Sequence, residues 1–230
     1  MIEEPPLLQI RRPTQRPTEA QLSALRGTPT GFLADAMGGK GAFDCAMAPL
    51  SVTDLPVEFC GVALTCETGP DDILAMTAGL TQVQSGDVLV VATGAWRGSA
   101  SAGDRVIGMA RNGGAVAFVT DGLVRDYEGI VEVGLPVVCA GLTPNSPFSK
   151  GPGKVGFPVI LGGRQVETGD VIIGDRSGTV VVPFDDLDRV IAEVAHISEI
   201  EAALDAKVAE GLTAPAKVQD LVQSDQVAWS

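Results

Sequence analysis

The stretch GDVLVVATG, residues 86–94, constrains the fold of this chain more than any other feature. Its apolar, mostly β-branched run from Val88 to Ala92 is bounded by Gly86-Asp87 on one side and Thr93-Gly94 on the other. A short apolar run without polar alternation is typical of a strand that is buried on both faces. Because such strands belong to parallel sheets covered by helices, the chain is expected to adopt an α/β fold.

The residues after this strand alternate between helix and strand patterns. The predicted elements are a loop of small residues at 95–104, a helix ending at Gly113-Gly114, a strand at 115–120, a short helix ending at Val133 and a strand at 136–140. This order of strands and helices predicts a parallel strand–helix–strand core.

Other patterns surround this core. Helices are predicted within 18–38 and 71–84, short strands within 47–66, and an antiparallel meander over 157–182. A long amphipathic helix is expected from Phe184 to about Glu210, and its apolar stripe includes the single histidine, His196, as a core residue. We therefore expect one α/β domain over residues 1–210 and a C-terminal tail or oligomer arm over 211–230.

Charge and composition exclude several classes of function. The net charge of −13 repels phosphate backbones, which disfavours a nucleic-acid partner. No apolar run reaches the roughly 18 residues of a membrane span, and Met1 to Pro17 does not resemble a signal peptide. The four cysteines lack CxxC spacing, so they are expected to be buried thiols of a cytoplasmic protein. With one histidine, a zinc site built on several histidines is impossible, and a metal would be held by oxygens, as Mg²⁺ or Mn²⁺ is.

Two loops carry the residues that can perform chemistry. The loop at 94–104 follows a buried strand, is rich in small residues such as Gly103, and leads into a helix whose first amides attract anions. The loop DGLVRD at 121–126 follows the next parallel strand, so both loops are expected at one edge of the sheet. Asp104 and Asp126 can then converge on one hard cation, with Arg125 as a fork for a carboxylate or a carbonyl.

The same residues also have purely structural interpretations. Asp104 can simply cap the helix that begins beside it. Arg125 and Asp126 can form a surface ion pair at the start of the next helix, which is a common arrangement. Spacing alone leaves these alternatives open.

At these residues the chain resembles a known family. The run GDVLVVATG, the pair Gly103-Asp104, the loop DGLVRD and the segment GLPVVCAG at 134–141 are similar to the regulator of ribonuclease activity A family, as is the later run GDVIIGDRSGTVVVP. That family includes 4-hydroxy-4-methyl-2-oxoglutarate and 4-carboxy-4-hydroxy-2-oxoadipate aldolases. Its enzymatic branch is marked by an Asp, twenty residues and then Arg-Asp, which this sequence matches with Asp104 and Arg125-Asp126.

The resemblance implies a fold and a role for each residue. The fold is a swivelling β/β/α layered domain, assembled as a homotrimer or homohexamer. Asp126 would bind Mg²⁺, Asp104 would hold waters on the metal, and Arg125 would contact the keto acid. The amides of Arg105 and Val106 would hold the substrate carboxylate, and Glu199 or Glu201 would reach a neighbouring subunit's site.

The implied activity is that of a lyase on a small 2-keto acid. Retro-aldol cleavage of a 4-hydroxy-2-keto acid and decarboxylation of oxaloacetate both pass through a pyruvate enolate, which a cation and Arg125 would stabilise. The alternative is a non-catalytic regulator that binds a ribonuclease or a helicase, as the family's namesake does. The substrate loop AWRGSAS and the pair Tyr127-Glu128 depart from the aldolase pattern, so the native substrate stays open.

Overall fold

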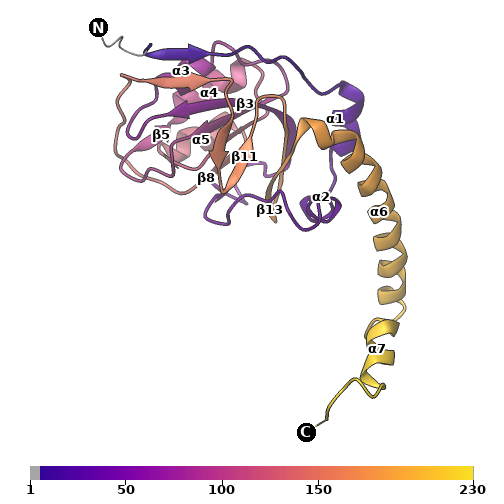
Figure 1. Ribbon diagram of the computed structural model, residues 1–230. Coiled ribbons are helices and arrows are strands. Elements are labelled where there is room, and N and C mark those ends of the chain that lie inside the picture. Colours follow the sequence, from indigo (N-terminus) through magenta and orange to yellow (C-terminus); the bar gives the residue numbers. More distant parts are fainter. Residues whose placement is uncertain (1–5, 230) are drawn as a thin grey trace.

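The structure, a computed structural model, describes residues 6–229 as an α/β body from which a long helix extends (Figure 1). A nine-stranded mixed sheet forms the centre, with the order β1-β9-β3-β4-β6-β8-β2 and with β12 and β13 attached beside β3. Its strands are β1 (Leu8–Ile10), β2 (Ala48–Pro49), β3 (Phe59–Thr68), β4 (Asp87–Ala92), β6 (Ala117–Thr120), β8 (Val137–Cys139), β9 (Gly153–Val155), β12 (Val171–Asp175) and β13 (Gly178–Val182).

The parallel core expected from the sequence is confirmed. Strands β3, β4, β6 and β8 pair in parallel, each with the next. Every residue of β4 is buried, because helices cover one face of the sheet and a β-hairpin covers the other. The covering helices are α3 (Leu74–Gly79), α4 (Asp104–Asn112) and α5 (Tyr127–Val133), and the hairpin is formed by β10 (Val159–Leu161) and β11 (Arg164–Val166).

The meander predicted for 157–182 is present as two antiparallel hairpins that lie in different sheets. The β10–β11 hairpin forms a sheet of its own, whereas the β12–β13 hairpin joins the central sheet because β12 pairs with β3. The loop predicted at 95–104 is also more ordered than expected. It contains β5 (Ala100–Ala102), which pairs in parallel with a second short strand, β7 (Leu123–Val124).

A third apolar cluster joins the remaining helices to β12 and β13. These helices are α1 (Glu19–Leu25), α2 (Thr30–Ala36), the 3₁₀ turn η1 (Phe184–Asp186) and the start of α6 (Leu187–Ala209). Thr18 caps α1 with a capping box. Thr30 does not cap a helix with its side chain; its amide and hydroxyl both donate to Asp175 at 2.8 Å.

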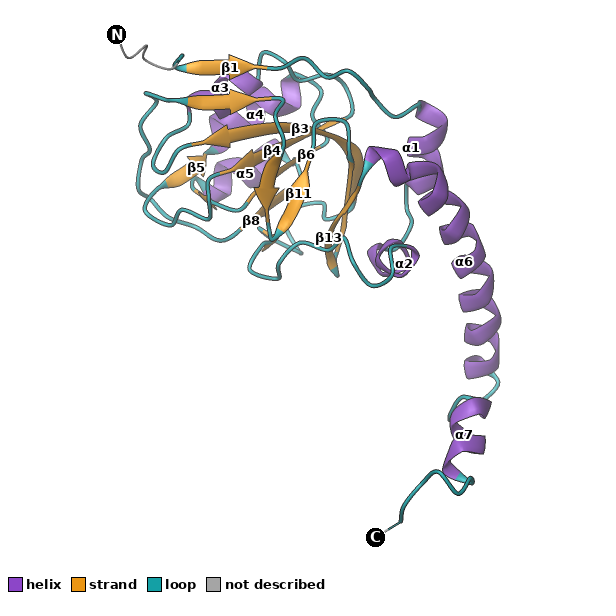
Figure 2. Cartoon of the chain, in the orientation of Figure 1, coloured by secondary structure: helices purple, strands orange, loops and turns teal. Residues whose placement is uncertain are grey.

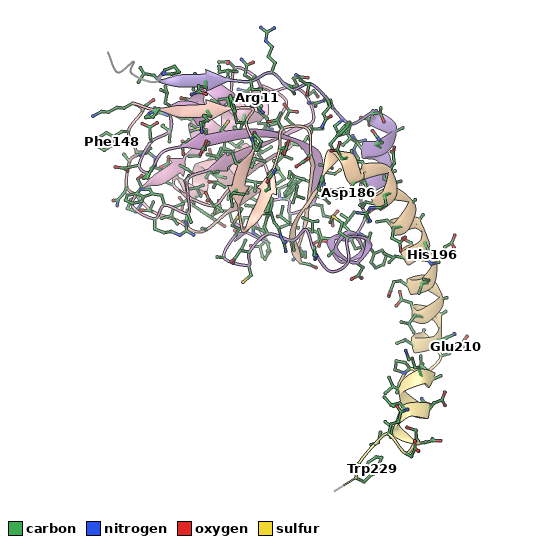
Figure 3. All side chains as sticks on the ribbon, in the orientation of Figure 1. Arg11, Phe148, Asp186, His196, Glu210 and Trp229 are labelled. Carbon is green, nitrogen blue, oxygen red and sulfur yellow. The ribbon has the colours of Figure 1, made fainter. Side chains whose placement is uncertain are left out.

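The long C-terminal helix is confirmed, but most of it packs against nothing within the described chain. Its buried residues lie in the first half, at Leu187, Val190 and Val194, and the rest of α6 extends away from the body (Figure 2). His196 is on the extending part and is exposed, so the prediction of a core histidine is wrong (Figure 3). The segment after α6 contains a further helix, α7 (Ala216–Val222), without any buried residue.

The four cysteines are free thiols. Cys66 and Cys139 are buried as expected, and burial raises the pKa of Cys66 to about 12. Cys45 is exposed and Cys60 half-buried, so the expectation of burial is wrong for Cys45. Among residues 6–229, no helix combines the length and the apolar character needed to cross a membrane.

Candidate active site

The candidate site lies beyond the carboxyl ends of β4 and β6. Because these two neighbouring strands are parallel, both end at the same edge of the sheet, which is where ligands of open α/β folds bind. The segment after β4 forms β5 and then begins α4 at Asp104, and the segment after β6 forms β7 and then begins α5 after Asp126. Because β5 and β7 pair with each other, they bring the first turns of α4 and α5 together.

Two aspartates lie where these helices meet, and each packs against a glycine of the other helix. A Cβ on Gly103, the N-cap of α4, would collide with Oδ2 of Asp126. A Cβ on Gly129, in the first turn of α5, would lie 2.7 Å from Oδ2 of Asp104. The two carboxylates therefore occupy space that side chains at these positions would fill.

Arg125 is held between a carboxylate and a hydroxyl. Its Nε lies 3.3 Å from Oδ2 of Asp126, and its Nη1 donates to Oγ of Ser146 at 2.6 Å. Both members of the ion pair keep considerable exposure, 37% for the Arg125 side chain and 46% for that of Asp126. The pair is thus positioned but open to a ligand.

The backbone of Asp126 is in the left-handed region, with φ 61° and ψ 52°. Aspartate tolerates this conformation better than most residues, but it still costs energy, and such strain is frequent at functional sites. The next residue, Tyr127, donates its hydroxyl to Asp54, and this bond lowers the pKa of Asp54 and raises the pKa of Tyr127. Asp54 thereby fixes the start of α5 beside Asp126.

Two hollows flank the Arg125–Asp126 pair. The first hollow, of about 610 Å³, is lined by these two residues and by Gly103, Asp104, Arg105, Val106 and Met109. The second hollow, of about 430 Å³, is lined by the same pair and by Tyr127, Glu128, Leu142, Thr143 and Pro144. A ligand bound at the pair can therefore extend into both.

The amides expected to hold a substrate carboxylate line the first hollow, with one difference. The amide of Arg105 already donates to Oδ1 of Asp104 at 2.7 Å, because Asp104 begins α4 and its carboxylate turns toward the helix start. An anion that uses this amide must displace Asp104. The capping role considered for Asp104 is thus present in part, although its Oδ2 faces Gly129.

Asp121 organises the loop after β4, a role that the sequence did not reveal. This buried carboxylate accepts from the amide of Thr93 at 2.7 Å, from its hydroxyl at 2.9 Å and from the amide of Ala95 at 2.8 Å. Arg97 donates to the backbone oxygen of Asp121. The only signal in the sequence was the Asp-Gly pair that follows an apolar strand.

Glu199 and Glu201 do not join the site within their own chain. Both lie on the part of α6 that extends from the body beside α1 and α2, whereas α4 and α5 cover a face of the central sheet (Figure 1). Glu199 is exposed and Glu201 half-buried. Either residue can reach a site only through a second copy of the chain.

The donor atoms at the site suit a hard cation with few protein ligands. Within residues 6–229, no cluster of three or more His, Cys, Asp or Glu side chains is suited to hold a metal, so the site offers two carboxylates. Mg²⁺ commonly keeps several waters and uses one or two carboxylates, whereas a structural zinc site needs four protein ligands. The residues present therefore fit Mg²⁺ or Mn²⁺.

Comparisons with known proteins agree with this architecture. The family model described as RraA-like: Aldolase/RraA matches residues 30–181, which include the whole candidate site except Glu199 and Glu201. A proposed 4-hydroxy-4-methyl-2-oxoglutarate aldolase of Halalkalibacterium halodurans is 28% identical over 193 residues, covering 84% of this chain and 90% of that protein. A protein of the same description from Burkholderia mallei is 32% identical over 123 residues, covering 54% of this chain and 74% of that protein.

Two solved structures share the fold. An uncharacterized protein from Pseudomonas syringae superposes with a TM-score of 0.73 at 23% identity, covering 86% of this chain and 96% of that one. Streptomyces coelicolor RraAS2, described as an unusual member of the RNase ES inhibitor RraA protein family, superposes with a TM-score of 0.72 at 25% identity, covering 84% of this chain and 99% of that one.

Proposed function

This chain belongs to the RraA-like family, and we propose that it is a metal-dependent lyase that cleaves a small 2-keto acid through a pyruvate enolate. The observation that carries the proposal is the convergence of Asp104, Arg125 and Asp126 at the first turns of α4 and α5. The names of the aldolase relatives support the same class of reaction. Retro-aldol cleavage of a 4-hydroxy-2-keto acid and decarboxylation of oxaloacetate are both included.

The chain's own residues would bind and orient the substrate. The substrate carboxylate would lie in the first hollow, at the start of α4, where the amide of Val106 and the side chain of Arg105 attract an anion. Arg125 would donate to the 2-keto oxygen. As the bond between C3 and C4 breaks, negative charge develops on that oxygen, and Arg125 would stabilise it.

Asp126 would hold Mg²⁺ or Mn²⁺ directly, and Asp104 would hold it through water. When bound, the cation would supply Lewis-acid stabilisation of the charge on the 2-keto oxygen. The ion pair between Arg125 and Asp126 would keep the guanidinium beside the carboxylate that would hold the cation.

Cleavage also requires a group that takes the proton from the 4-hydroxyl. Within the described chain, no other carboxylate besides Asp104, Asp126 and Glu128 lines the two hollows. We propose that Glu199 of a second copy of the chain supports this proton transfer, with Glu201 as the alternative, in a homotrimer or homohexamer. The exposure of α6 beyond Val194 is compatible with such an arm.

The test is pyruvate release from oxaloacetate and from 4-hydroxy-4-methyl-2-oxoglutarate, with Mg²⁺ and with EDTA. We expect turnover with the metal and its loss with EDTA, and Arg125→Lys should lower kcat by about 10²–10³ because the fork that stabilises the oxyanion is removed. A rate of pyruvate release that changes neither with EDTA nor with Arg125→Lys would refute the proposal.

The rival function is a regulator that binds a ribonuclease or a helicase. The name of the Streptomyces relative motivates it. A binding protein needs no open pair of carboxylates beside an arginine at the end of a parallel sheet, which favours the enzyme. Absence of turnover together with capture of a purified ribonuclease would favour the rival.

A further inference from the structure

The two hollows beside Arg125 and Asp126 differ in charge. In the first hollow, the positive charge of Arg105 offsets the negative charge of Asp104. The amino end of the nine-residue helix α4 also faces this hollow. In the second hollow, Glu128 adds a negative charge, and the shared Arg125 is the only cation among the described residues that line it. Arg125, Asp126 and any cation on Asp126 are common to both hollows, so the difference comes from Glu128, and an anionic group is less favoured in the second hollow than in the first.

The remaining walls of the second hollow are largely uncharged and partly apolar. Tyr127 lies beside Asp126 and is held through its hydroxyl by Asp54, so its ring has a fixed place. Leu142 is 52% exposed although it is apolar, and Pro144 lies beside it in the same wall. This surface suits a small alkyl group or a neutral hydroxyl-bearing carbon better than a carboxylate.

The segment that carries Leu142 and Pro144 is fixed rather than loose. Val124 of β7 donates to Gly141 at 2.9 Å and accepts from Thr143 at 3.0 Å. Asn145 accepts from the amide of Ala100 at 3.0 Å and donates to the carbonyl of Gly98 at 2.8 Å. The walls of the second hollow, from α5 and from residues 142–144, are thus held in place by backbone and side-chain hydrogen bonds.

We propose that the second hollow selects the leaving half of the substrate and disfavours a second carboxylate there, so that the preferred substrates are 4-hydroxy-2-keto monocarboxylates with a small neutral substituent at C4. This inference rests on the proposed function, since it places the 2-keto carboxylate in the first hollow. Cleavage would break the bond between C3 and C4, leave its electron pair on the pyruvate enolate and convert C4 into an aldehyde. The 4-hydroxyl loses its proton, and C3 gains one when the enolate becomes pyruvate.

Glu128 also has a plain structural explanation, because an acidic residue in the first turn of a helix is stabilised by the helix dipole. That explanation predicts a change in melting temperature but no change in the choice of substrate. Substrate preference is therefore the readout that separates the two roles.

The experiment compares 4-hydroxy-2-ketopentanoate, whose C4 bears a methyl group, with 4-hydroxy-4-methyl-2-oxoglutarate, whose C4 also bears a carboxylate. We expect wild type to have the higher kcat/KM for the monocarboxylate. Glu128→Gln should raise kcat/KM for the dicarboxylate, relative to the monocarboxylate, by about fivefold, as expected for removing a nearby like charge in a solvated site. High salt should reduce the preference of wild type, because it screens the repulsion.

Glu132→Gln is the matched control, since it removes the same charge from the exposed surface of the same helix one turn further along. It should leave the ratio of the two kcat/KM values as in wild type. Equal or better cleavage of the dicarboxylate by wild type, with a ratio that Glu128→Gln does not move, would overturn the inference and leave the lyase intact. Failure to cleave either compound would overturn the proposed function and this inference with it.

Discussion

At the scale of single residues, the candidate site depends on space as much as on charge. Gly103 has an extended backbone, with φ −132°, which any residue adopts, so its importance lies in the missing side chain. The carboxylate of Asp126 fills that place, and Gly129 leaves similar room for Asp104. A methyl group at either position therefore acts on the geometry of a carboxylate and not on the backbone.

Gly103→Ala tests this dependence on space. The added methyl group should displace the Asp126 carboxylate, and we expect Mg²⁺ affinity measured by calorimetry to fall at least tenfold. Stability should change by less than about 1 kcal/mol, because the exposed end of Asp126 can move. Gly31→Ala is the control: no heavy atom lies within 4 Å of its added Cβ, and the loss of a glycine from the first turn of α2 should stabilise the protein by no more than about 0.5–1 kcal/mol without a change in metal affinity. Unchanged affinity in Gly103→Ala would contradict the packing described here.

The sequence allowed the position of three site residues to be anticipated, but not that of others. Asp104, Arg125 and Asp126 follow parallel strands, and parallel neighbours always release the chain at one edge. The role of Asp121 depends on the conformation of the loop that begins at Thr93, which brings the Thr93 amide to the Asp121 carboxylate. The spacing of residues in the sequence does not specify that conformation. The engagement of the Arg105 amide by Asp104 likewise follows from a side-chain rotamer, which a sequence pattern does not specify.

At the scale of secondary structure, helices and strands with a strong local pattern of apolar residues were predicted well. Short strands that form only through contacts with distant residues were not. Strand β4 and the first half of α6 carry strong local signals. The parallel pairs β1–β9 and β5–β7 involve three or fewer residues per strand, so only their distant partners reveal them. The helix predicted for 71–84 is reduced to α3, because Asp71 has a left-handed backbone with φ 61° and Asp72 binds amides outside a helix.

Asp72 connects the start of α3 to the segment that passes the site. Its carboxylate accepts from the amides of Leu74 at 2.8 Å, Lys150 at 2.6 Å and Gly151 at 2.9 Å. Burial raises its pKa, but the three amide bonds together outweigh burial, so the pKa lies below the usual carboxyl value. Its stabilisation is therefore complete at neutral pH and is lost as the pH falls through the lowered pKa of the folded state.

Asp72→Asn should lower the free energy of unfolding at pH 7 by about 1–3 kcal/mol, since it leaves three partly buried amides poorly paired. Urea titrations of wild type and variant at pH 7 and pH 3 measure the difference, which should shrink at pH 3. Asp71→Asn is the control. It removes one negative charge at the residue next to Asp72, and asparagine tolerates the left-handed backbone of this position. An equal loss of stability at both pH values would rule out this account of the Asp72 charge.

At the scale of the whole molecule, the extended helix is the feature that a single chain does not explain. Ile200, Leu204 and Val208 recur at four-residue spacing on α6 and are 50%, 40% and 56% exposed. An apolar row of this kind on a helix that leaves the body is expected to pack against another copy of the chain. Such packing would carry Glu199 and Glu201 to a neighbouring molecule.

Mixed oligomers test whether one copy completes the site of another. Chains with Asp126→Asn and chains with Glu199→Gln should each be nearly inactive, but co-expressed at equal levels they should recover about a quarter of wild-type turnover, because random assembly gives that share of sites with both native residues. Glu201→Gln in place of Glu199→Gln identifies which glutamate acts. No recovery with either glutamate variant would show that the site does not use a second copy.

If the site stabilises a pyruvate enolate with the help of a cation, it must also form that enolate from pyruvate itself. Exchange of the methyl protons of pyruvate in D₂O, followed by NMR, measures enolate formation without assuming a native substrate. We expect exchange with Mg²⁺, none with EDTA, loss of exchange in Asp126→Asn, and wild-type rates in Asp35→Asn, which removes an exposed carboxylate from α2. Exchange no faster than in buffer, or exchange that survives both EDTA and Asp126→Asn, would show that the site does not stabilise a pyruvate enolate with a cation.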